Sequence, residues 1–437
     1  MDQGNNISKK PLILKIILVI VILLLVICFI KAYNNYKSGS SSTTSNTSTN
    51  VLSDNTITSG GVYEITGSNE CITINTTDKV ELALNEATIT CENGPAINVY
   101  SAGKVTITFT GENIITSTTT EDLDGAIYSK DDLIFTGSGS LKITSNYDGI
   151  VSKDDLVIND GSYVIVAADD GIRGRDSVQI TGGTFNITSS GDGIKATNDE
   201  DSSLGYIEID DGVFTINSVG DAIQAETKLI INDGTFNIKT TGNASTTSAK
   251  GLKAITAITL NGGEYVINTT DDGIHADGDI TINEGNITIN SADDGIHADG
   301  MVYISNGTID ITASEGIEGT YVKIDGGSIN INATDDGINA GNKSSAYAVT
   351  IEINGGNITI TMGSGDTDGI DSNGNIYING GTINITANSP FDYDGEAKYT
   401  GGTIIVNGTT TNQITNQMMG GNAGGMSQGG HGDVMRR

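Results

Sequence analysis

Apolar and polar residues alternate along most of this chain in short runs, which are separated by glycine-containing turns. In the stretch 272–294, Asp-Gly-Ile is followed by a turn, an alternating run over 279–282, a second turn and another alternating run over 286–290. Alternation with a period of two predicts β-strands that bury one face. Each such stretch therefore predicts three short strands joined by tight turns.

The same unit recurs along the chain at a nearly fixed spacing. A fixed period indicates one supersecondary unit stacked on itself, and the lack of a leucine pattern or of helical periodicity favours a parallel β-helix, an all-β solenoid. The side chains expected to point inward are β-branched, as in Ile274, Ile280, Ile282, Ile287 and Ile289. The Asp-Gly-Ile triplets, mostly 21 or 22 residues apart, begin at Asp148, Asp170, Asp192, Asp272, Asp294, Asp336 and Asp368, with a near-copy at Glu315.

Three insertions interrupt the period, and an insertion in a solenoid must leave at a corner. The segments around 197–205 and 341–348 lengthen the same corner, so both loops should emerge on one side of the stack. The segment 240–250 lengthens a different corner.

The composition predicts five successive segments. An apolar run is long enough to span a bilayer and has no cleavage site of small residues after it, which favours a retained signal anchor. The short N-terminus would stay in the cytoplasm and the large acidic part would be exported. The expected segments are a cytoplasmic N-terminus at 1–11, a transmembrane signal anchor at 12–30, a flexible Ser/Thr/Asn linker at 31–50, the β-helix at 51–408 and a disordered Gly/Met-rich tail at 409–437.

Charge excludes one class of partner. Residues 51–437 contain 53 acidic and 17 basic residues, a net charge of −36 with histidine neutral. Nucleic acid is not expected as a partner, because phosphate binding requires clustered Lys and Arg. Cys71 and Cys91 are 20 residues apart, and the sequence leaves open whether they form a disulfide between neighbouring coils or remain buried thiols.

Stacking would place the Asp of each triplet directly above its counterpart. Two carboxylates ~5 Å apart repel by about 3 kcal/mol at an intermediate dielectric, so the column needs relief from solvent and raised pKa values, from Lys and Arg, or from a hard cation. Asp-Gly is a good turn dipeptide, and a solvated surface explains the isolated acids. Turn formation does not explain the extra acids of Asp-Asp-Gly-Ile-His-Ala-Asp-Gly at 271–278 and 293–300.

We therefore predict calcium at the doubled positions. The histidines of that motif, His275 and His297, are interpreted as stacked surface side chains, and no cysteine lies near them in the sequence to form a tetrahedral metal site. The predicted calcium ligands are Asp271, Asp272, Asp277, Asp293, Asp294, Asp299, Asp335 and Asp336.

A calcium-dependent polysaccharide lyase is the catalytic alternative, and it needs a basic residue beside the acids. Arg173 and Arg175 stand in the one acidic run that contains arginine, although charge compensation between coils is the favoured interpretation. Sugar binding usually relies on aromatic platforms, and the chain has no Trp. Tyr206 and Tyr347, in the two loops expected on the same side, are the candidate carbohydrate-binding residues.

Several coils resemble those of a known family. DGAIYSKDDL from Asp124, DGIVSKDDL from Asp148, GDGIKATNDED from Gly191 and DDGIHADG from Asp271 are similar to coils of the bacterial cell-surface β-helix proteins that bind cellulose and acidic sugars. The likeness runs from about residue 58 to 406. It implies a right-handed parallel β-helix with a strand-rich N-terminal part, bound calcium, and non-catalytic binding of a polysaccharide such as polygalacturonate. The resemblance implies individual ligand residues only in the Asp-Asp-Gly-Ile coils.

The sequence thus predicts a membrane-anchored, extracytoplasmic β-helix with a strand-rich N-terminal cap. Its expected function is non-catalytic binding of acidic or β-linked polysaccharide with the help of calcium. The alternatives that stay open are a calcium-dependent lyase and a structural adhesin or spacer.

Overall fold

The computed structural model describes residues 50, 52, 55–119, 123–364 and 367–416. The chain divides into two compact units, Met1–Ser48 and Thr49–Arg437, and every described residue belongs to the second unit. The described residues form strands and turns, with no helix among them. This part of the chain accordingly holds no helix capable of crossing a membrane, and the predicted anchor at 12–30 lies outside it.

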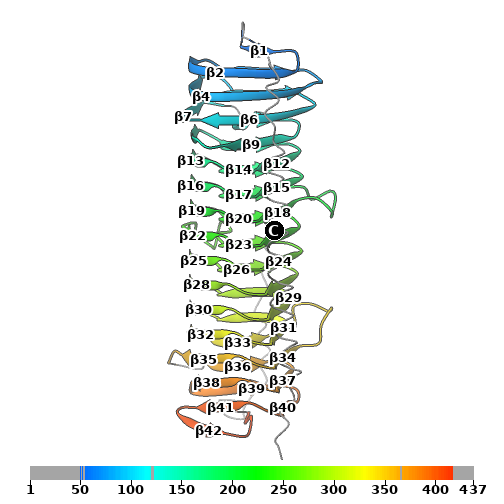
Figure 1. Ribbon diagram of the computed structural model, residues 1–437. Coiled ribbons are helices and arrows are strands. Elements are labelled where there is room, and N and C mark those ends of the chain that lie inside the picture. The colour runs from blue at the N-terminus through cyan, green and yellow to red at the C-terminus, as the bar shows by residue number, and fades with distance from the viewer. Residues whose placement is uncertain (1–49, 51, 53–54, 120–122, 365–366, 417–437) are drawn as a thin grey trace, which may run out of the picture. The chain divides into compact units, whose positions relative to one another are not determined.

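The strands stack in parallel as successive coils, which confirms the predicted solenoid (Figure 1). Each regular coil contributes one strand to each of three columns, which we call A, B and C in chain order. The A column contains β1 Thr56–Ile57, β3 Ile72–Asn75, β5 Ile97–Ser101, β8 Gly125–Ser129, β11 Asp148–Ser152, β14 Ile172–Gly174, β17 Ile194–Ala196, β20 Ile223–Ala225, β23 Leu252–Ala254, β26 Ile274–Ala276, β33 Asp336–Ala340, β36 Asp368–Ser372 and β39 Ser389–Tyr393.

The B and C columns follow in the same order. Column B contains β6 Lys104–Thr110, β9 Leu133–Gly137, β12 Asp155–Ile158, β15 Ser177–Ile180, β18 Tyr206–Ile209, β21 Lys228–Ile231, β24 Ala257–Leu260, β27 Asp279–Ile282, β34 Thr350–Ile353, β37 Asn375–Ile378 and β40 Ala397–Tyr399. Column C contains β7 Glu112–Ser117, β10 Ser140–Ser145, β13 Ser162–Ala167, β16 Thr184–Ser189, β19 Val213–Ser218, β22 Thr235–Thr240, β25 Glu264–Thr269, β28 Asn286–Ser291, β30 Thr308–Ala313, β32 Ser328–Ala333, β35 Asn357–Met362, β38 Thr382–Thr386 and β41 Thr403–Val406.

Four longer strands cross from one column to the next. β29 Ile296–Ile304 and β31 Ile317–Ile324 run through columns A and B. β2 Gly61–Asn69 and β4 Lys79–Cys91 run through columns B and C. Because β2 and β4 pair in parallel with each other and with β6 and β7, the strand-rich N-terminal part continues the stack.

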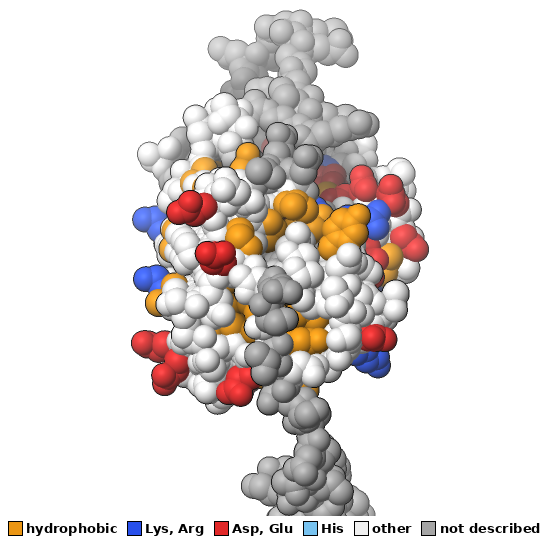
Figure 2. Space-filling view, turned by 90° about the horizontal axis from the view of Figure 1, so that it is seen from above, with side chains coloured by type: hydrophobic (Ala, Val, Ile, Leu, Met, Phe, Trp, Pro, Cys, Tyr) orange, Lys and Arg blue, Asp and Glu red, His pale blue; other side chains and the backbone are white. Residues whose placement is uncertain are grey.

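The core follows the predicted register. Ile274 is paired with Ile296, Ile296 with Ile317 and Ile317 with Ile338, and all four side chains are fully buried. The outer positions between the buried ones carry polar or charged residues. Seen from above the stack, acidic and basic side chains lie around its periphery (Figure 2).

Glycine serves two different purposes at the corners. Gly285, in the turn between columns B and C, has φ +136°, a conformation that side-chain-bearing residues rarely adopt. Gly273 of an Asp-Gly-Ile triplet has no such φ, but a Cβ there would lie 2.5 Å from Ile289 Cγ2 and 2.6 Å from the Gly295 carbonyl oxygen. The triplet glycine is thus required by close packing.

The insertions leave the stack where the sequence predicts. The loops between β17 and β18 and between β33 and β34 both lie at the A–B corner and emerge on the same side (Figure 1). The 240–250 insertion lies between β22 and β23, at the C–A corner.

A specific contact stabilises each end of the described stack. Cys71 and Cys91 form a disulfide, which decides between the two possibilities that the sequence leaves open. At the other end, β42 Thr409–Thr411 pairs antiparallel with β41. The ordered stack therefore extends past residue 408, where the disordered tail was expected to begin; residues 417–437 lie outside the described part.

Candidate functional site

The Asp of each Asp-Gly-Ile triplet lies at or just before the start of an A strand, and in several coils its side chain bonds to the next coil. Asp148 Oδ1 accepts the backbone N–H of Asp170 at 2.9 Å, and Asp170 Oδ1 accepts that of Asp192 at 2.8 Å. Asp192 Oδ1 in turn accepts the N–H of Asp221 at 2.7 Å. All four residues are buried. The repeated aspartate therefore forms a structural ladder, and a solvated acidic surface is the wrong interpretation at these positions.

The second oxygen of these carboxylates faces a basic side chain. That side chain comes from the outward position of the A strand in the same coil or the next one. Lys195 Nζ lies 2.6 Å from Asp192 Oδ2, and Lys253 Nζ lies 3.2 Å from Asp221 Oδ2. Charge repulsion along this part of the ladder is thus relieved by the chain's own cations.

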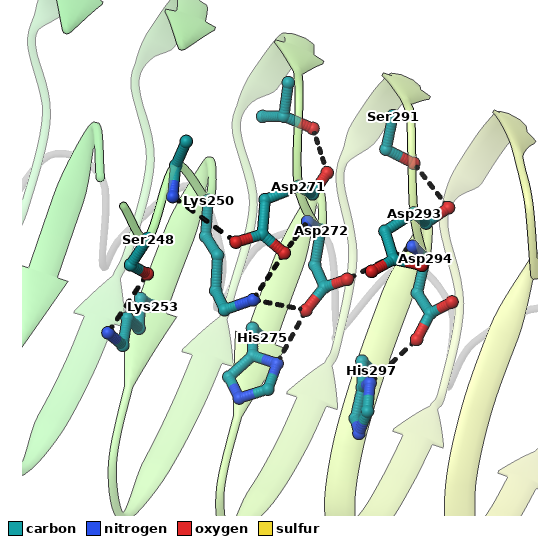
Figure 3. Close-up of polar contacts among 12 residues, drawn as sticks. Ser248, Lys250, Lys253, Asp271, Asp272, His275, Ser291, Asp293, Asp294 and His297 are labelled. Carbon is teal, nitrogen blue, oxygen red and sulfur yellow. Dashed lines mark hydrogen bonds and ion pairs between the residues drawn. The ribbon is translucent and has the colours of Figure 1, made fainter. Parts of the chain in front are cut away.

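Lys250 takes the place of an aspartate in the ladder. Its backbone N–H donates to Asp221 Oδ1 at 2.8 Å, and its Nζ lies 2.7 Å from both Asp271 Oδ1 and Asp272 Oδ2 (Figure 3). Burial opposes ionisation of Asp272, but the hydrogen bond from His275 and the charge of Lys250 outweigh it, so the pKa of Asp272 lies below its ordinary value. One ammonium group thus contacts both acids of the doublet 271–272, and His275 is a second partner of Asp272.

The two motif histidines are largely buried and are surrounded by carboxylates, which raise the pKa of both. His275 Nδ1 lies 2.8 Å from Asp272 Oδ2 and its Nε2 lies 3.1 Å from Asp277 Oδ1. His297 Nδ1 lies 2.7 Å from Asp294 Oδ2 and 3.2 Å from Glu318 Oε2. Burial alone would lower the pKa of His297, but the surrounding carboxylates raise it to about 10.

The sequence interpretation of these histidines is right about their position in neighbouring coils and wrong about their exposure. Their rings lie one above the other in neighbouring coils, with centroids 4.8 Å apart, but the ring planes are tilted by 50° to each other. Their side chains are only 15% and 14% exposed, so they are not surface residues. They continue the outward row of column A, which runs through Arg173, Lys195, Gln224 and Lys253 and is basic except at Gln224.

The structure separates the predicted calcium ligands into groups. Oxygens of Asp271, Asp272 and Asp293 lie within 4.8 Å of one another, and carboxylate oxygens suit calcium, although Lys250 already contacts the first two. The ladder continues as Asp272 Oδ1 accepts the N–H of Asp294 at 3.1 Å. Asp277 and Asp299 lie at the other end of their A strands, about half exposed, beside the histidines. Asp335 and Asp336 belong to a later coil.

That later coil lacks the basic row. The outward A positions continue as Glu318, Asn339 and Asp371. Burial, followed by the charges of Asp371, Glu315 and Asp335, raises the pKa of Asp336 to about 8. Burial and neighbouring acids also raise the pKa of Asp371 to about 7. Glu318 still pairs with His297 and Lys343, but among the described residues no lysine or histidine pairs with Asp336 or Asp371, and their raised pKa values favour the protonated acids.

The arginines considered for catalysis are held by carboxylates. Arg173 Nη2 pairs with Asp124 and lies 2.7 Å from Asp148 Oδ2, and its side chain is 19% exposed. Arg175 pairs with Asp176 and Glu200. This geometry favours charge compensation for both residues.

The two candidate carbohydrate-binding tyrosines lie on the outer side of column B but in separate places. The hydroxyl of Tyr206 accepts a hydrogen bond from Gln179 Nε2 at 3.0 Å. Tyr347 reaches back along the stack, and its hydroxyl donates to Asp279 Oδ2 at 2.7 Å. Its ring lies 6.1 Å from that of Tyr321.

Sequence reasoning missed the cations that complete the ladder. Lys195 and Lys253 occupy the same position relative to Asp-Gly-Ile or its variant as His275 does, so aligning the coils would have identified them. Lys250 was harder to find, because it ends an insertion and replaces the aspartate of the triplet.

Comparison with known proteins gives one family and one solved structure. The profile of the family described as carbohydrate-binding domain-containing protein matches residues 53–295 and 292–419. A solved polysaccharide lyase-like protein from C. thermocellum, a gadolinium derivative, is 27% identical over 52% of this chain and 86% of that chain, with a TM-score of 0.39. A TM-score this low does not support conclusions about the present chain. No curated protein matches the chain.

Proposed function

The chain belongs to the family of carbohydrate-binding domain-containing proteins, and we propose that it binds polysaccharide at the cell surface without cleaving it. The family match over residues 53–419 is the observation that carries this proposal. The engagement of Arg173 and Arg175 by carboxylates favours binding over lyase chemistry, because it leaves both guanidinium groups paired. The candidate ligands are polygalacturonate and cellulose.

The direct test is retention on polysaccharide. The full-length protein, in mild detergent, is mixed with insoluble cellulose and with immobilised polygalacturonate, each in calcium and in chelator, and bound protein is measured. Retention on either material supports the proposal, and no retention on any of them contradicts it and favours a structural spacer. The same mixtures are followed for unsaturated sugar product, whose steady release would establish a lyase.

We propose that the stack is displayed outside the membrane by the span at 12–30. The Cys71–Cys91 disulfide supports an oxidising compartment. Protease added to intact cells should remove the acidic stack, and full protection with an intact membrane would overturn this location.

We propose that calcium binds at the acidic corner, by which we mean the turns between columns C and A that carry the aspartate ladder. The favoured place is the end of the ladder around Asp336, where the carboxylates lack a basic partner. Asp335 and Asp336 offer carboxylate oxygens, the donor type that calcium prefers, and the charge of Asp371 acts on Asp336. Asp271, Asp272 and Asp293 offer a second set, in which calcium would compete with Lys250.

Calcium should therefore raise the melting temperature of the protein specifically. A ligand that binds only the folded state at tenfold excess over its Kd stabilises it by about 1.4 kcal/mol. The measurement compares melting in chelator, in calcium and in sodium chloride of equal ionic strength, for the wild type and Asp336→Asn. A calcium-specific rise that the substitution weakens is expected; equal responses to both salts would mean simple screening.

A further inference from the structure

The outer side of column B carries a cluster of tyrosines in its later coils. Met301 and Tyr303 point outward from β29, because the residues between and beside them, Val302 and Ile304, are fully buried. In the register, Met301 is followed by Tyr321, and Tyr303 is followed by Lys323, Glu352 and Tyr377. We call Tyr303, Tyr321, Tyr347 and Tyr377 the tyrosine face.

The loop between β33 and β34 completes this face. Tyr347 folds back from that loop to Asp279, which is 68 residues earlier in the chain, and packs beside Tyr321. The four rings therefore come from four separate segments, and the loop is fixed in place by a hydrogen bond at its tyrosine.

A fixed polar network lies among the rings. Tyr303 donates to Asp325 Oδ2 at 2.9 Å, and Tyr321 donates to Glu352. Asn354 Nδ2 joins the two carboxylates, donating to Asp325 Oδ1 at 2.8 Å and Glu352 Oε1 at 3.0 Å. Such a network orients the acceptors before any ligand arrives, which reduces the entropy lost on binding.

The face adjoins a concave surface. A groove of about 810 Å³ runs along the B–C turns of five coils and includes Asn306, Gly307 and Gly327 in its lining. Tyr303 precedes Asn306 by three residues, and Asp325 precedes Gly327 by two. Apolar rings beside a groove with a few convergent polar groups are the combination typical of ligand sites.

Aromatic rings and carboxylates together suit a sugar. The C–H face of a sugar ring packs on an aromatic ring, and its hydroxyls donate to carboxylates and amide oxygens. Tyr303 and Tyr377 are three coils apart, about 14 Å at the ~4.8 Å strand spacing. The face is thus long enough for several units of an extended chain.

The charge of the face selects the kind of sugar. Asp279, Asp325 and Glu352 lie on it, and Lys323 is already 3.0 Å from Asp325 Oδ2. The ammonium groups of Lys323 and Lys398 lie over the rings of Tyr303 and Tyr377, and Lys398 is 2.7 Å from Glu396 Oε2. An acidic sugar would therefore meet like charges beside lysines that are already paired, whereas a neutral sugar needs no cation. This disfavours polygalacturonate at this surface.

We propose that the tyrosine face binds a neutral β-linked glucan chain, independently of calcium. This inference rests on the proposed polysaccharide-binding function and specifies its surface and ligand class. The acidic corner, on the other side of the A–B turn, is a separate surface.

The test uses full-length protein in chelator and titrates it with a soluble cello-oligosaccharide. Tyr303→Ala and Tyr377→Ala should each weaken binding about tenfold, the loss expected when an anchoring aromatic residue is truncated. Tyr303→Phe should bind nearly as well as the wild type, because it retains the ring. Tyr100→Ala is the control, since Tyr100 is 55% exposed and lies on a distant coil. Melting temperatures show which variants remain folded.

The outcomes separate this inference from the function on which it rests. If the wild type binds the glucan and both folded alanine variants bind it equally well, the tyrosine face is wrong and polysaccharide binding stands. Binding of polygalacturonate alone would overturn the neutral ligand class and also leave the function standing. Binding of no glycan under any condition would overturn both.

Discussion

Replacing Lys250 with methionine should destabilise the folded protein by about 3–5 kcal/mol at neutral pH, the range for breaking a buried ion pair by removing one partner. The Lys250 side chain is 13% exposed, and its ammonium group contacts both Asp271 and Asp272. Methionine preserves the apolar stem but leaves two carboxylates side by side in a buried corner. Of the two acids, the neighbouring His275 contacts Asp272 and not Asp271, so Asp271 would lose its ion pair with the described residues.

Chemical denaturation of the full-length protein measures this effect. Lys239→Met is the matched control, because Lys239 is an exposed residue on the outer side of β22, and it should change stability by less than about 0.5 kcal/mol. The penalty at Lys250 should shrink in acid, since protonated carboxylates carry no charge that a lysine has to compensate. A pH-independent loss would indicate that packing of the lysine stem, and not its charge, is what matters.

The sequence predicted the fold because its period constrains every coil at once. Alternation fixes which side of each strand is buried, and a regular spacing fixes which isoleucines meet, as Ile274 and Ile296 do. An insertion changes neither, so the loop at 341–348 could be placed correctly at a corner. The path of that loop could not, because Tyr347 bonds to Asp279 three coils earlier and no local pattern encodes that contact.

The chemistry of the acidic corner was harder to predict. Asp148 appears in the sequence as a turn residue, yet one of its oxygens caps the backbone of the next coil and the other meets Arg173. Both partners are one coil away, 22 and 25 residues later in the sequence. Counting acids in one coil therefore suggested a metal, whereas comparing the same position in successive coils would have revealed the row of cations and the place where it ends.

The end of that row leads to the second prediction: Asp336→Asn should stabilise the protein by about 2–3 kcal/mol at pH 8 in the absence of calcium. The pKa of Asp336 is raised to about 8, first by burial and then by Asp371, Glu315 and Asp335. A shift of one unit corresponds to about 1.4 kcal/mol, and partial exposure of the side chain reduces the effect below the full shift. Asparagine mimics the protonated acid and preserves the oxygen that accepts the Asp368 N–H.

The sign of the pH dependence follows from linkage. Between about pH 4 and 8 the folded state retains a proton on Asp336 that the unfolded state has lost, so wild-type stability falls as pH rises through this window. The gain from Asp336→Asn should be absent near pH 4, grow towards pH 8 and then level off. Denaturation curves of both proteins across this range, in chelator, test this dependence.

Asp272 provides a control of opposite sign, because it occupies the same ladder position but has Lys250 and His275 as partners. Asp272→Asn should destabilise the protein at neutral pH, since it leaves buried cations without their carboxylate. Calcium should also narrow the difference between the two proteins at pH 8: a bound cation favours the ionised acid, so the wild type gains stability that the asparagine variant cannot. If Asp336→Asn is neutral at every pH in chelator, then solvent already relieves the charge at this end of the ladder, and the need for a proton or a metal ion there disappears.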